Sequence, residues 1–179
     1  NSKDLCLLNY IPNFIDFGVS SLKIEGRMKS LHYVATTVSV YRQAIDSYYN
    51  HRETYKVKEE WLEELLNCTK RGYTENFIKG EPAVDSYIYK GEKNQHSFSF
   101  VGIVEDYLDG FIRIEVRNKI ILGDEIIIFT PTYQKFSLFF NEMFDLEGNL
   151  LNSANPGMVI LVKGNYIDPY SLLRKKVTF

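Results

Sequence analysis

Charged residues recur on alternate positions in the stretch SLKIEGRMKS, residues 21–30. This alternation is typical of a strand, because successive side chains point to opposite faces. Arg27 offers a planar fork suited to phosphate or carboxylate, and Gly26 permits close approach of a backbone. A salt-bridged strand end with solvated lysines explains the same residues. The chemical interpretation predicts a substrate-binding set that consists of Lys23, Glu25, Arg27, Lys29 and Arg42.

Other motifs of catalysis are missing from the sequence. His32, His51 and His96 lie far apart, and none belongs to an HExxH motif, so we expect them to be surface or structural residues. The chain has no GxSxG elbow, no GxxxxGKS loop and no GxGxxG after a strand. A serine or cysteine protease within these residues would have no visible triad.

Two cysteines occur, Cys6 and Cys68, and neither has the spacing of a metal site. We expect Cys68 to be a small buried hydrophobe. Cys6, in SKDLC, is predicted to lie near a helix start, where a thiolate is stabilised. It could be one ligand at most, whereas an iron–sulfur cluster needs about four. The cysteine count excludes a disulfide framework and favours a reducing cytoplasm.

The composition is that of a globular protein that buries a core, with 179 residues of which 45% are hydrophobic. A net charge of −2 and a pI near 6.0 exclude a global positive field, so a polyanion site would have to be a local patch. No apolar run predicts a membrane span. The start at Asn1, directly in a helix-like pattern, suggests a piece of something longer.

The first 80 residues have mainly helical patterns. A helix capped by Ser2 or Asp4 is expected to end at Gly18, with Pro12 kinking or splitting it. VSSLKIEG predicts a strand, and Ser30 can cap a long helix. Its expected apolar stripe is Val34, Val38, Tyr41, Ile45 and Tyr48. A short helix over VKEEWLEELLNCTKRGYT, with Lys70 and Arg71 at its end, follows.

Helix, strand and helix in this order indicate a parallel α/β unit, and one strand cannot form a parallel sheet alone. The first region therefore resembles the tail of a barrel or of a doubly wound sheet. From about Val84 the runs FSFVGIVEDY, FIRIEVRN, DEIIIFTP, KFSLFFNEMFD and MVILVKG predict short strands, which suggest a small antiparallel barrel or sandwich. The predicted class is α+β, with domains at 1–80 and 84–179.

Taken in order, NSKDLC, GVSSLKIEGRMKSLHYVATTVSVYRQAID, RGYTENF, FVGIVEDY and IEVRNKIILGDEIIIFTP resemble the C-terminal part of proteins in peptidase family U32. The resemblance is strongest to the collagenase-like, tRNA-hydroxylation branch. It implies the tail of a TIM-like barrel, followed by a small β-barrel similar to the second domain of translation elongation factors. It also implies an iron–sulfur cluster in some full-length relatives, for which Cys6 matches a position that is cysteine in only some of them.

The resemblance implies participation in hydroxylation of the tRNA wobble uridine at its 5-position, in the cytoplasm. The β-barrel would then dock RNA or a partner, through basic residues at Arg117, Lys119, Arg174, Lys175 and Lys176. The alternatives are a collagenase-like peptidase, which has the family label but no visible nucleophile, and a non-catalytic accessory module.

We expect the isolated fragment to be inactive and to hold no cofactor of its own. Its expected partners are tRNA and an upstream TIM-like barrel of the same protein, with no membrane. Exposed edges make a homo-oligomer of the fragment a further expectation.

Overall fold

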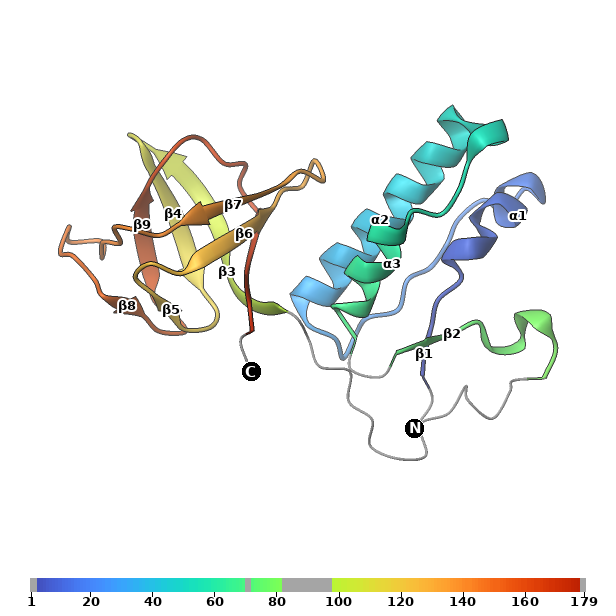
Figure 1. Ribbon diagram of the computed structural model, residues 1–179, viewed down its shortest axis with the longest axis horizontal. Coiled ribbons are helices and arrows are strands. Elements are labelled where there is room, and N and C mark those ends of the chain that lie inside the picture. Colours follow the sequence, from blue (N-terminus) through green and yellow to red (C-terminus); the bar gives the residue numbers. More distant parts are fainter. Residues whose placement is uncertain (1–2, 70–71, 82–97, 178–179) are drawn as a thin grey trace. The chain divides into compact units, whose positions relative to one another are not determined.

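The computed structural model describes residues 3–69, 72–81 and 98–177. The chain divides into two compact units, Asn1–His96 and Ser97–Phe179 (Figure 1). The first unit is mainly helical and the second is built from strands. The predicted boundary between residues 80 and 84 falls partly on residues outside the described ranges.

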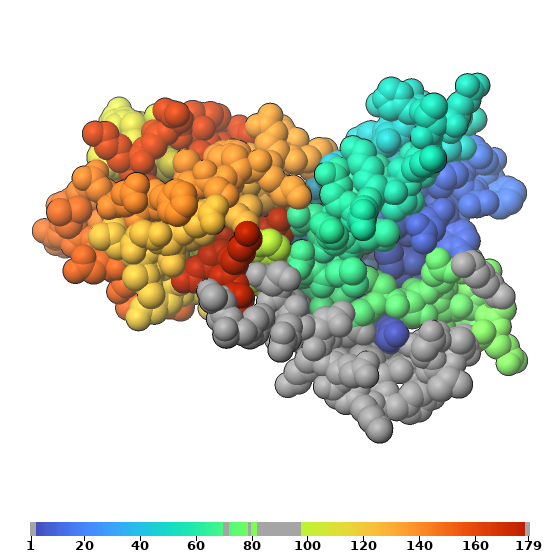
Figure 2. All heavy atoms as spheres, in the orientation of Figure 1, coloured from blue at the N-terminus to red at the C-terminus, as the bar shows by residue number. Residues whose placement is uncertain are grey.

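The helical unit combines three α-helices, short 3-10 turns and one small parallel strand pair. Its elements are β1 (Asp4–Leu5), η1 (Leu8–Tyr10), α1 (Ile11–Asp16), α2 (Leu31–Asn50), η2 (Arg52–Thr54), α3 (Glu59–Leu66), β2 (Tyr73–Thr74) and η3 (Asn76–Lys79). β1 pairs with β2 in parallel, so the start of the unit is joined to its end. In the space-filling view, α3 lies at the surface of this unit (Figure 2).

Helix α2 begins as the sequence predicts but buries a different face. The Ser30 side chain accepts a hydrogen bond from the Tyr33 backbone N–H at 3.2 Å, which confirms the cap. The expected stripe is only partly right, because Val38 is 47% exposed while Val40 and Ala44 are buried. The reason is that α2 packs against both α1 and α3, and two neighbours on different sides shift the buried face.

The predicted first helix starts later than expected. Asp4 is not a helix cap, because it lies in β1, and the α-helix begins only at Ile11. Pro12 occupies its first turn, where the missing N–H costs nothing, so the segment divides into η1 and α1. Gly18 adopts a φ of +74° just after the helix, as expected of a C-terminal glycine.

The predicted strand over residues 19–26 is wrong as a sheet element. The segment has no regular secondary structure and pairs with no strand among the described residues. A strand needs a partner for its backbone groups, and here the neighbouring β1 pairs with β2 instead. Lys29 N–H donates to the Gly26 carbonyl at 2.9 Å, which forms a turn before α2.

A small hydrophobic core holds the helical unit together. Its buried members come from η1, α1, α2 and α3, and are Leu8, Ile11, Val40, Ala44, Trp61 and Leu65. Helix α3 has Glu59 and Glu60 in its first turn, as predicted, where carboxylates suit the helix dipole. The predicted basic end at Lys70 and Arg71 lies outside the described residues.

The second unit is an antiparallel six-stranded sheet that curls into a half-barrel (Figure 1). Its strand order is β7-β6-β10-β3-β4-β9, and a separate pair joins β5 to β8. The strands are β3 (Phe98–Leu108), β4 (Phe111–Val116), β5 (Ile120–Ile121), β6 (Glu125–Phe129), β7 (Lys135–Phe139), β8 (Ser153–Ala154), β9 (Val159–Lys163) and β10 (Leu172–Lys176). After β7, Phe144 exchanges two backbone hydrogen bonds with Leu161 of β9, both 2.9 Å long.

The turn and strand chemistry of this unit follows the sequence closely. Asp109 and Gly110 have φ values of +51° and +85°, as a two-residue hairpin turn between β3 and β4 requires. In β4 the apolar residues Ile112, Ile114 and Val116 are at most 1% exposed, which confirms the alternation. The central strand β10 was missed, because LLRKKV carries three basic residues in succession and shows no clear alternation.

The mixed α and β composition is confirmed, and the second unit is a curled antiparallel sheet. The tail of a TIM-like barrel and the likeness to an elongation-factor domain stay predictions. No helix within the described ranges combines the length and the apolar character that crossing a membrane requires.

Gly102 of β3 offers a direct test of the packing in the half-barrel. A Cβ atom there would lie 2.7 Å from the Glu115 carbonyl oxygen and 3.1 Å from Ile114 Cγ2. We expect Gly102→Ala to lower the free energy of unfolding by about 1–3 kcal/mol through overpacking. The exposed Ser137→Ala change in β7 is the control, expected within about 0.5 kcal/mol of the parent. If urea denaturation shows the two variants to be equally stable, the close packing described around Gly102 is contradicted.

Candidate functional site

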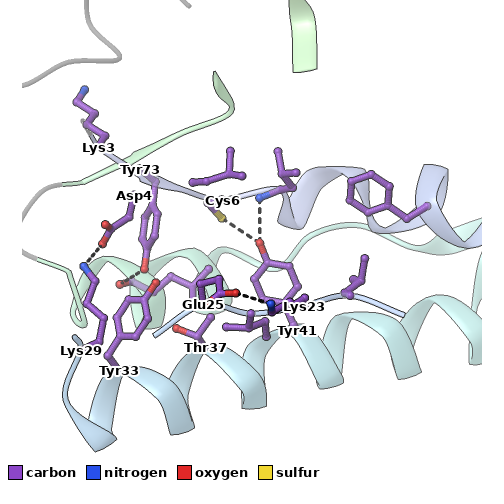
Figure 3. Close-up of a pocket in the computed structure, with 16 residues that line it drawn as sticks. Lys3, Asp4, Cys6, Lys23, Glu25, Lys29, Tyr33, Thr37, Tyr41 and Tyr73 are labelled. Carbon is purple, nitrogen blue, oxygen red and sulfur yellow. Dashed lines mark hydrogen bonds and ion pairs between the residues drawn. The ribbon is translucent and has the colours of Figure 1, made fainter. Parts of the chain in front are cut away.

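A cavity of about 420 Å³ lies within the helical unit (Figure 3). It is lined by residues 3–7, by residues 22–25, by one face of α2, and by residues of α3 and β2. The apolar part of the wall consists of Leu5, Leu7, Phe14, Leu22, Ile24 and Leu65. The size and the apolar walls are those of a small-molecule site.

Helix α2 supplies one wall of the cavity through the pattern YVATTVSVY. Tyr33, Thr37 and Tyr41 are four residues apart, so they stand above one another on one face. Tyr73 adds a third phenol from β2, and its hydroxyl donates to the Leu65 carbonyl at 3.1 Å. The wall therefore presents aromatic rings together with hydroxyl groups.

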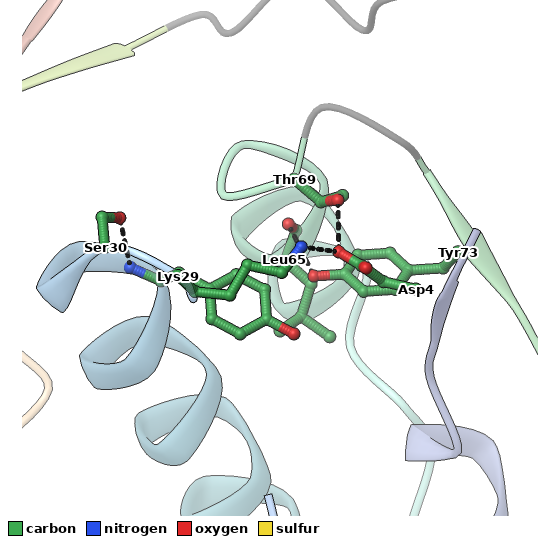
Figure 4. Close-up of polar contacts among 7 residues, drawn as sticks. Asp4, Lys29, Ser30, Leu65, Thr69 and Tyr73 are labelled. Carbon is green, nitrogen blue, oxygen red and sulfur yellow. Dashed lines mark hydrogen bonds and ion pairs between the residues drawn. The ribbon is translucent and has the colours of Figure 1, made fainter. Parts of the chain in front are cut away.

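The Asp4 carboxylate ties three distant segments together at one end of the cavity (Figure 4). It accepts from Lys29 Nζ at 2.6 Å and from Thr69 Oγ1 at 2.7 Å. The side chains of Asp4 and Lys29 are 15% and 30% exposed, so this pair is more shielded than a surface ion pair. Lys29 Nζ also lies 4.9 Å from the centre of the Tyr33 ring.

Tyr41 of α2 contacts residues 6 and 7, which also line the cavity. Its hydroxyl oxygen accepts from the Leu7 backbone N–H at 2.9 Å and faces Cys6 Sγ at 3.8 Å. Thr37 lies one turn away and is 6% exposed. Its Oγ1 neighbours the Tyr33 side chain but has no partner of normal hydrogen-bond geometry among the described residues.

The cavity tyrosines stay neutral well above physiological pH. Burial raises the pKa of Tyr33, and the nearby Asp4 carboxylate raises it further. Burial also raises the pKa of Tyr41 and of Tyr73, with Cys6 adding to the effect at Tyr41. Desolvation disfavours a phenolate, so these groups act as neutral hydrogen-bonding partners.

The predicted substrate-binding set is brought together only in part. Lys23, Glu25 and Lys29 line the cavity. Lys23 and Glu25 pair at 2.9 Å, with side chains 86% and 71% exposed, so they lie at its mouth. Arg27 is exposed in the turn after Gly26 and does not line the cavity.

Arg42 does not lie in this site. It pairs with Asp46 one turn along α2, on the exposed surface. The position follows from helical geometry, because residue 42 follows Tyr41 by one position and therefore lies about 100° around the helix. The structure thus separates Arg42 from Lys23, Glu25 and Lys29, which line the cavity.

Sequence reasoning missed several residues of the cavity. The sequence predicts Asp4 as a possible helix cap and Tyr41 as part of an apolar stripe, and it does not single out Tyr33 or Tyr73. The spacing of Tyr33, Thr37 and Tyr41 was a usable signal, because it places two phenols and a hydroxyl on one helix face. Thr69 gave no signal, since its contact with Asp4 joins residues 65 positions apart.

The described residues do not fit an iron–sulfur cluster. Cys6 lines the cavity and lies between β1 and η1, so it is near a helix start as predicted, although that helix is a short 3-10 turn. Both cysteines are free thiols, and no group of three or more potential metal ligands occurs within the described ranges. A cluster needs about four ligands, more than the described residues bring together.

Cys68 and His32 form a second contact that the sequence did not reveal. Cys68 Sγ lies 4.0 Å from His32 Nδ1, and His32 is 7% exposed at the start of α2. Neither residue lines the cavity. The burial agrees with the structural role expected for His32, whereas His51 ends α2 at the surface and His96 lies outside the described residues.

The predicted basic surface of the half-barrel is present only in part. Arg174 is 2% exposed and stacks over the Phe98 ring at 4.5 Å, so its availability to RNA was wrongly predicted. Lys175 pairs with Asp124 at 2.7 Å, and Arg117 pairs with Glu115 at 2.9 Å. Exposed cations from the predicted group are Arg117, Lys119 and Lys176. The unit from residue 97 has eight Lys and Arg against ten Asp and Glu.

Two family models match this chain. Residues 1–87 match peptidase family U32, and residues 96–174 match the peptidase family U32 C-terminal domain. The chain belongs to peptidase family U32, as the motifs around SLKIEGR predicted.

Curated relatives include proteins named for two different activities. The tRNA hydroxylation protein P1 of Bacillus subtilis is 38% identical over 177 residues, which are 97% of this chain and 42% of that protein. The tRNA hydroxylation protein P of Escherichia coli is 36% identical over 133 residues, or 73% of this chain and 29% of that protein. A collagenase of Porphyromonas gingivalis is 29% identical over 133 residues, which are 73% of this chain and 37% of that protein.

The chain spans less than half the length of these relatives. A solved structure, the C-terminal domain of a Geobacillus thermoleovorans protein described as a U32 peptidase, is 29% identical with a TM-score of 0.41. The match covers 44% of this chain and 92% of that domain.

Loss of the Asp4 carboxylate should destabilise the helical unit. We expect Asp4→Asn to lower the free energy of unfolding by about 1–3 kcal/mol, because it weakens two hydrogen bonds that include a charged donor. Lys23→Ala breaks an exposed pair and should change stability by less than about 0.5 kcal/mol. Chemical denaturation followed by tryptophan fluorescence measures both, and an unchanged Asp4→Asn stability would refute the link.

The raised tyrosine pKa values predict a loss of stability in alkali. Above about pH 10 the unfolded chain loses phenolic protons that the folded unit retains, so unfolding is favoured increasingly as pH rises. The stability from these groups is complete below that pH. Tyr73→Phe should flatten the alkaline decline, and the exposed Tyr49→Phe should not. Identical pH profiles for the two variants would disprove the assignment.

Proposed function

We propose that this chain is the C-terminal portion of a protein that takes part in 5-hydroxylation of the tRNA wobble uridine. The observation that carries the proposal is the relationship to tRNA hydroxylation protein P1 of Bacillus subtilis, which extends over 97% of the chain. Both units are included in that match, so the proposal does not depend on one domain alone.

The cavity in the helical unit supports this proposal chemically. Its mouth carries Lys23, whereas Lys29 is paired with Asp4 at one end, and Arg27 is exposed in the turn after Gly26. Arg27 has no ion-pair partner within the described ranges, so its guanidinium is available for a phosphate or carboxylate oxygen. A local group of cations suits a polyanion even though the whole chain is slightly acidic.

The half-barrel is proposed to act as a docking module for RNA or a protein partner. Its acidic balance and its paired Arg117 and Lys175 argue against general attraction to phosphate. Docking by shape or through a protein contact fits these charges better. The collagenase relatives leave proteolysis as the competing function. It is the weaker candidate, because no nucleophile and base meet in the described cavity.

The proposal predicts that deletion of the full-length gene removes 5-hydroxylation from wobble uridines. Mass spectrometry of nucleosides from purified tRNA measures it, and the intact gene should restore the modification. An Arg27→Ala form should restore less than about a tenth, because a charge-assisted contact to the substrate is lost. Strains that lack a paralogue are needed for the assay.

Lys56→Ala is the matched control, since Lys56 is exposed and lies outside the cavity. It should restore full modification. Unchanged tRNA after deletion would sink the proposal and bring peptide cleavage assays forward. Restoration by Arg27→Ala equal to that by Lys56→Ala would remove Arg27 from the site while leaving the function intact.

A further inference from the structure

We propose that the cavity of the helical unit receives the unstacked uridine nucleotide of the RNA substrate. This inference rests on the proposed function, because it names the part of the substrate that the cavity would hold. Proteins that act on a base remove it from its stack and place it in a pocket. A cavity of about 420 Å³ with aromatic walls has the size and surface for such a guest.

The walls suit a flat, partly apolar ring. Tyr33, Tyr41 and Tyr73 present phenol rings, and Leu22 and Ile24 add aliphatic groups to the lining. Figure 3 shows these tyrosines between α2 and the strand-like segments. A nucleobase has a π-face that aromatic side chains bind at about 1–3 kcal/mol per base. The same surface would offer much less to a flexible peptide.

The Thr37 hydroxyl in the cavity wall neighbours the Tyr33 side chain, and its hydrogen bonding is incomplete. Thr37 is 6% exposed, and its Oγ1 makes no hydrogen bond of normal geometry within the described ranges. A buried hydroxyl without a partner costs free energy, and a ligand that pairs with it recovers that cost. A hydroxyl both donates and accepts, so it matches the imide edge of uracil, which has an N–H between two carbonyl groups.

The mouth of the cavity can hold the attached phosphate. Lys23 is 86% exposed, and its ion-pair partner among the described residues is the exposed Glu25 at 2.9 Å. An exposed pair of this kind is weak, so a phosphate can displace Glu25 at little cost. Lys29 is less available, because Asp4 holds it at 2.6 Å. The cavity thus combines an aromatic interior with a cation at its entrance.

The same chemistry would also recognise free uridine monophosphate. The RNA-bound nucleotide is the source favoured here, because the exposed Arg27 adds a cation outside the cavity lining, where a second phosphate of an RNA strand could bind. An RNA strand offers a phosphate group to each cation, whereas a mononucleotide has one.

The first test is photo-crosslinking of the full-length protein to an anticodon stem-loop that carries 4-thiouridine at the wobble position. Mapping by mass spectrometry should place the crosslink in the peptides that hold Tyr33, Tyr41 or Tyr73. Excess uridine monophosphate should compete poorly. A crosslink confined to other peptides would overturn the inference, and so would competition by the free nucleotide at concentrations equal to the RNA.

The second test measures the affinity of the same RNA by fluorescence anisotropy. We expect Thr37→Val to weaken binding by about 3- to 10-fold through loss of one hydrogen bond, and Thr37→Ser to retain it. Lys23→Ala should weaken binding and lower the slope of log affinity against log salt by about one. Lys56→Ala is the control. Equal affinity of Thr37→Val, Thr37→Ser and the parent would overturn the inference.

Failure here is separable from failure of the proposed function. If gene deletion abolishes wobble hydroxylation but the crosslink lies elsewhere, the function stands and the cavity is not the base site. If deletion leaves tRNA unchanged and the stem-loop does not bind, the function itself fails.

Discussion

The ion pair between Asp4 and Lys29 is the constraint on which the helical unit depends. Asp4 begins the unit, Lys29 immediately precedes the cap of α2, and Thr69 follows α3, so a single carboxylate joins three segments (Figure 4). The strand pair β1 and β2 closes the same region. These contacts hold the unpaired residues 19–26 beside α2, and the cavity is the space that they leave.

The alternating charges of SLKIEGRMKS have different roles in the structure, whereas on one face of a strand they would share one. Lys29 points inward to the Asp4 carboxylate, whereas Lys23 and Glu25 stay exposed at the cavity mouth. Arg27 occupies the turn that redirects the chain into α2. One charge therefore stabilises the fold, and the others remain available for a ligand.

Local chemistry was predictable from the sequence wherever it depends on near neighbours. The Ser30 cap, the turn at Asp109 and Gly110 and the alternation in β4 each follow from a few adjacent residues. Long-range contacts were not predictable. The partner of Asp4, the burial of Arg174 over Phe98 and the lack of pairing at residues 19–26 depend on segments that meet only in the folded chain.

The most direct measurement of the central claim is a structure of the full-length protein bound to an anticodon stem-loop. The account predicts density for the wobble uridine between the tyrosines of α2 and β2, with its phosphate near Lys23. A cavity filled by the protein's own upstream chain, with the RNA bound elsewhere, would contradict it.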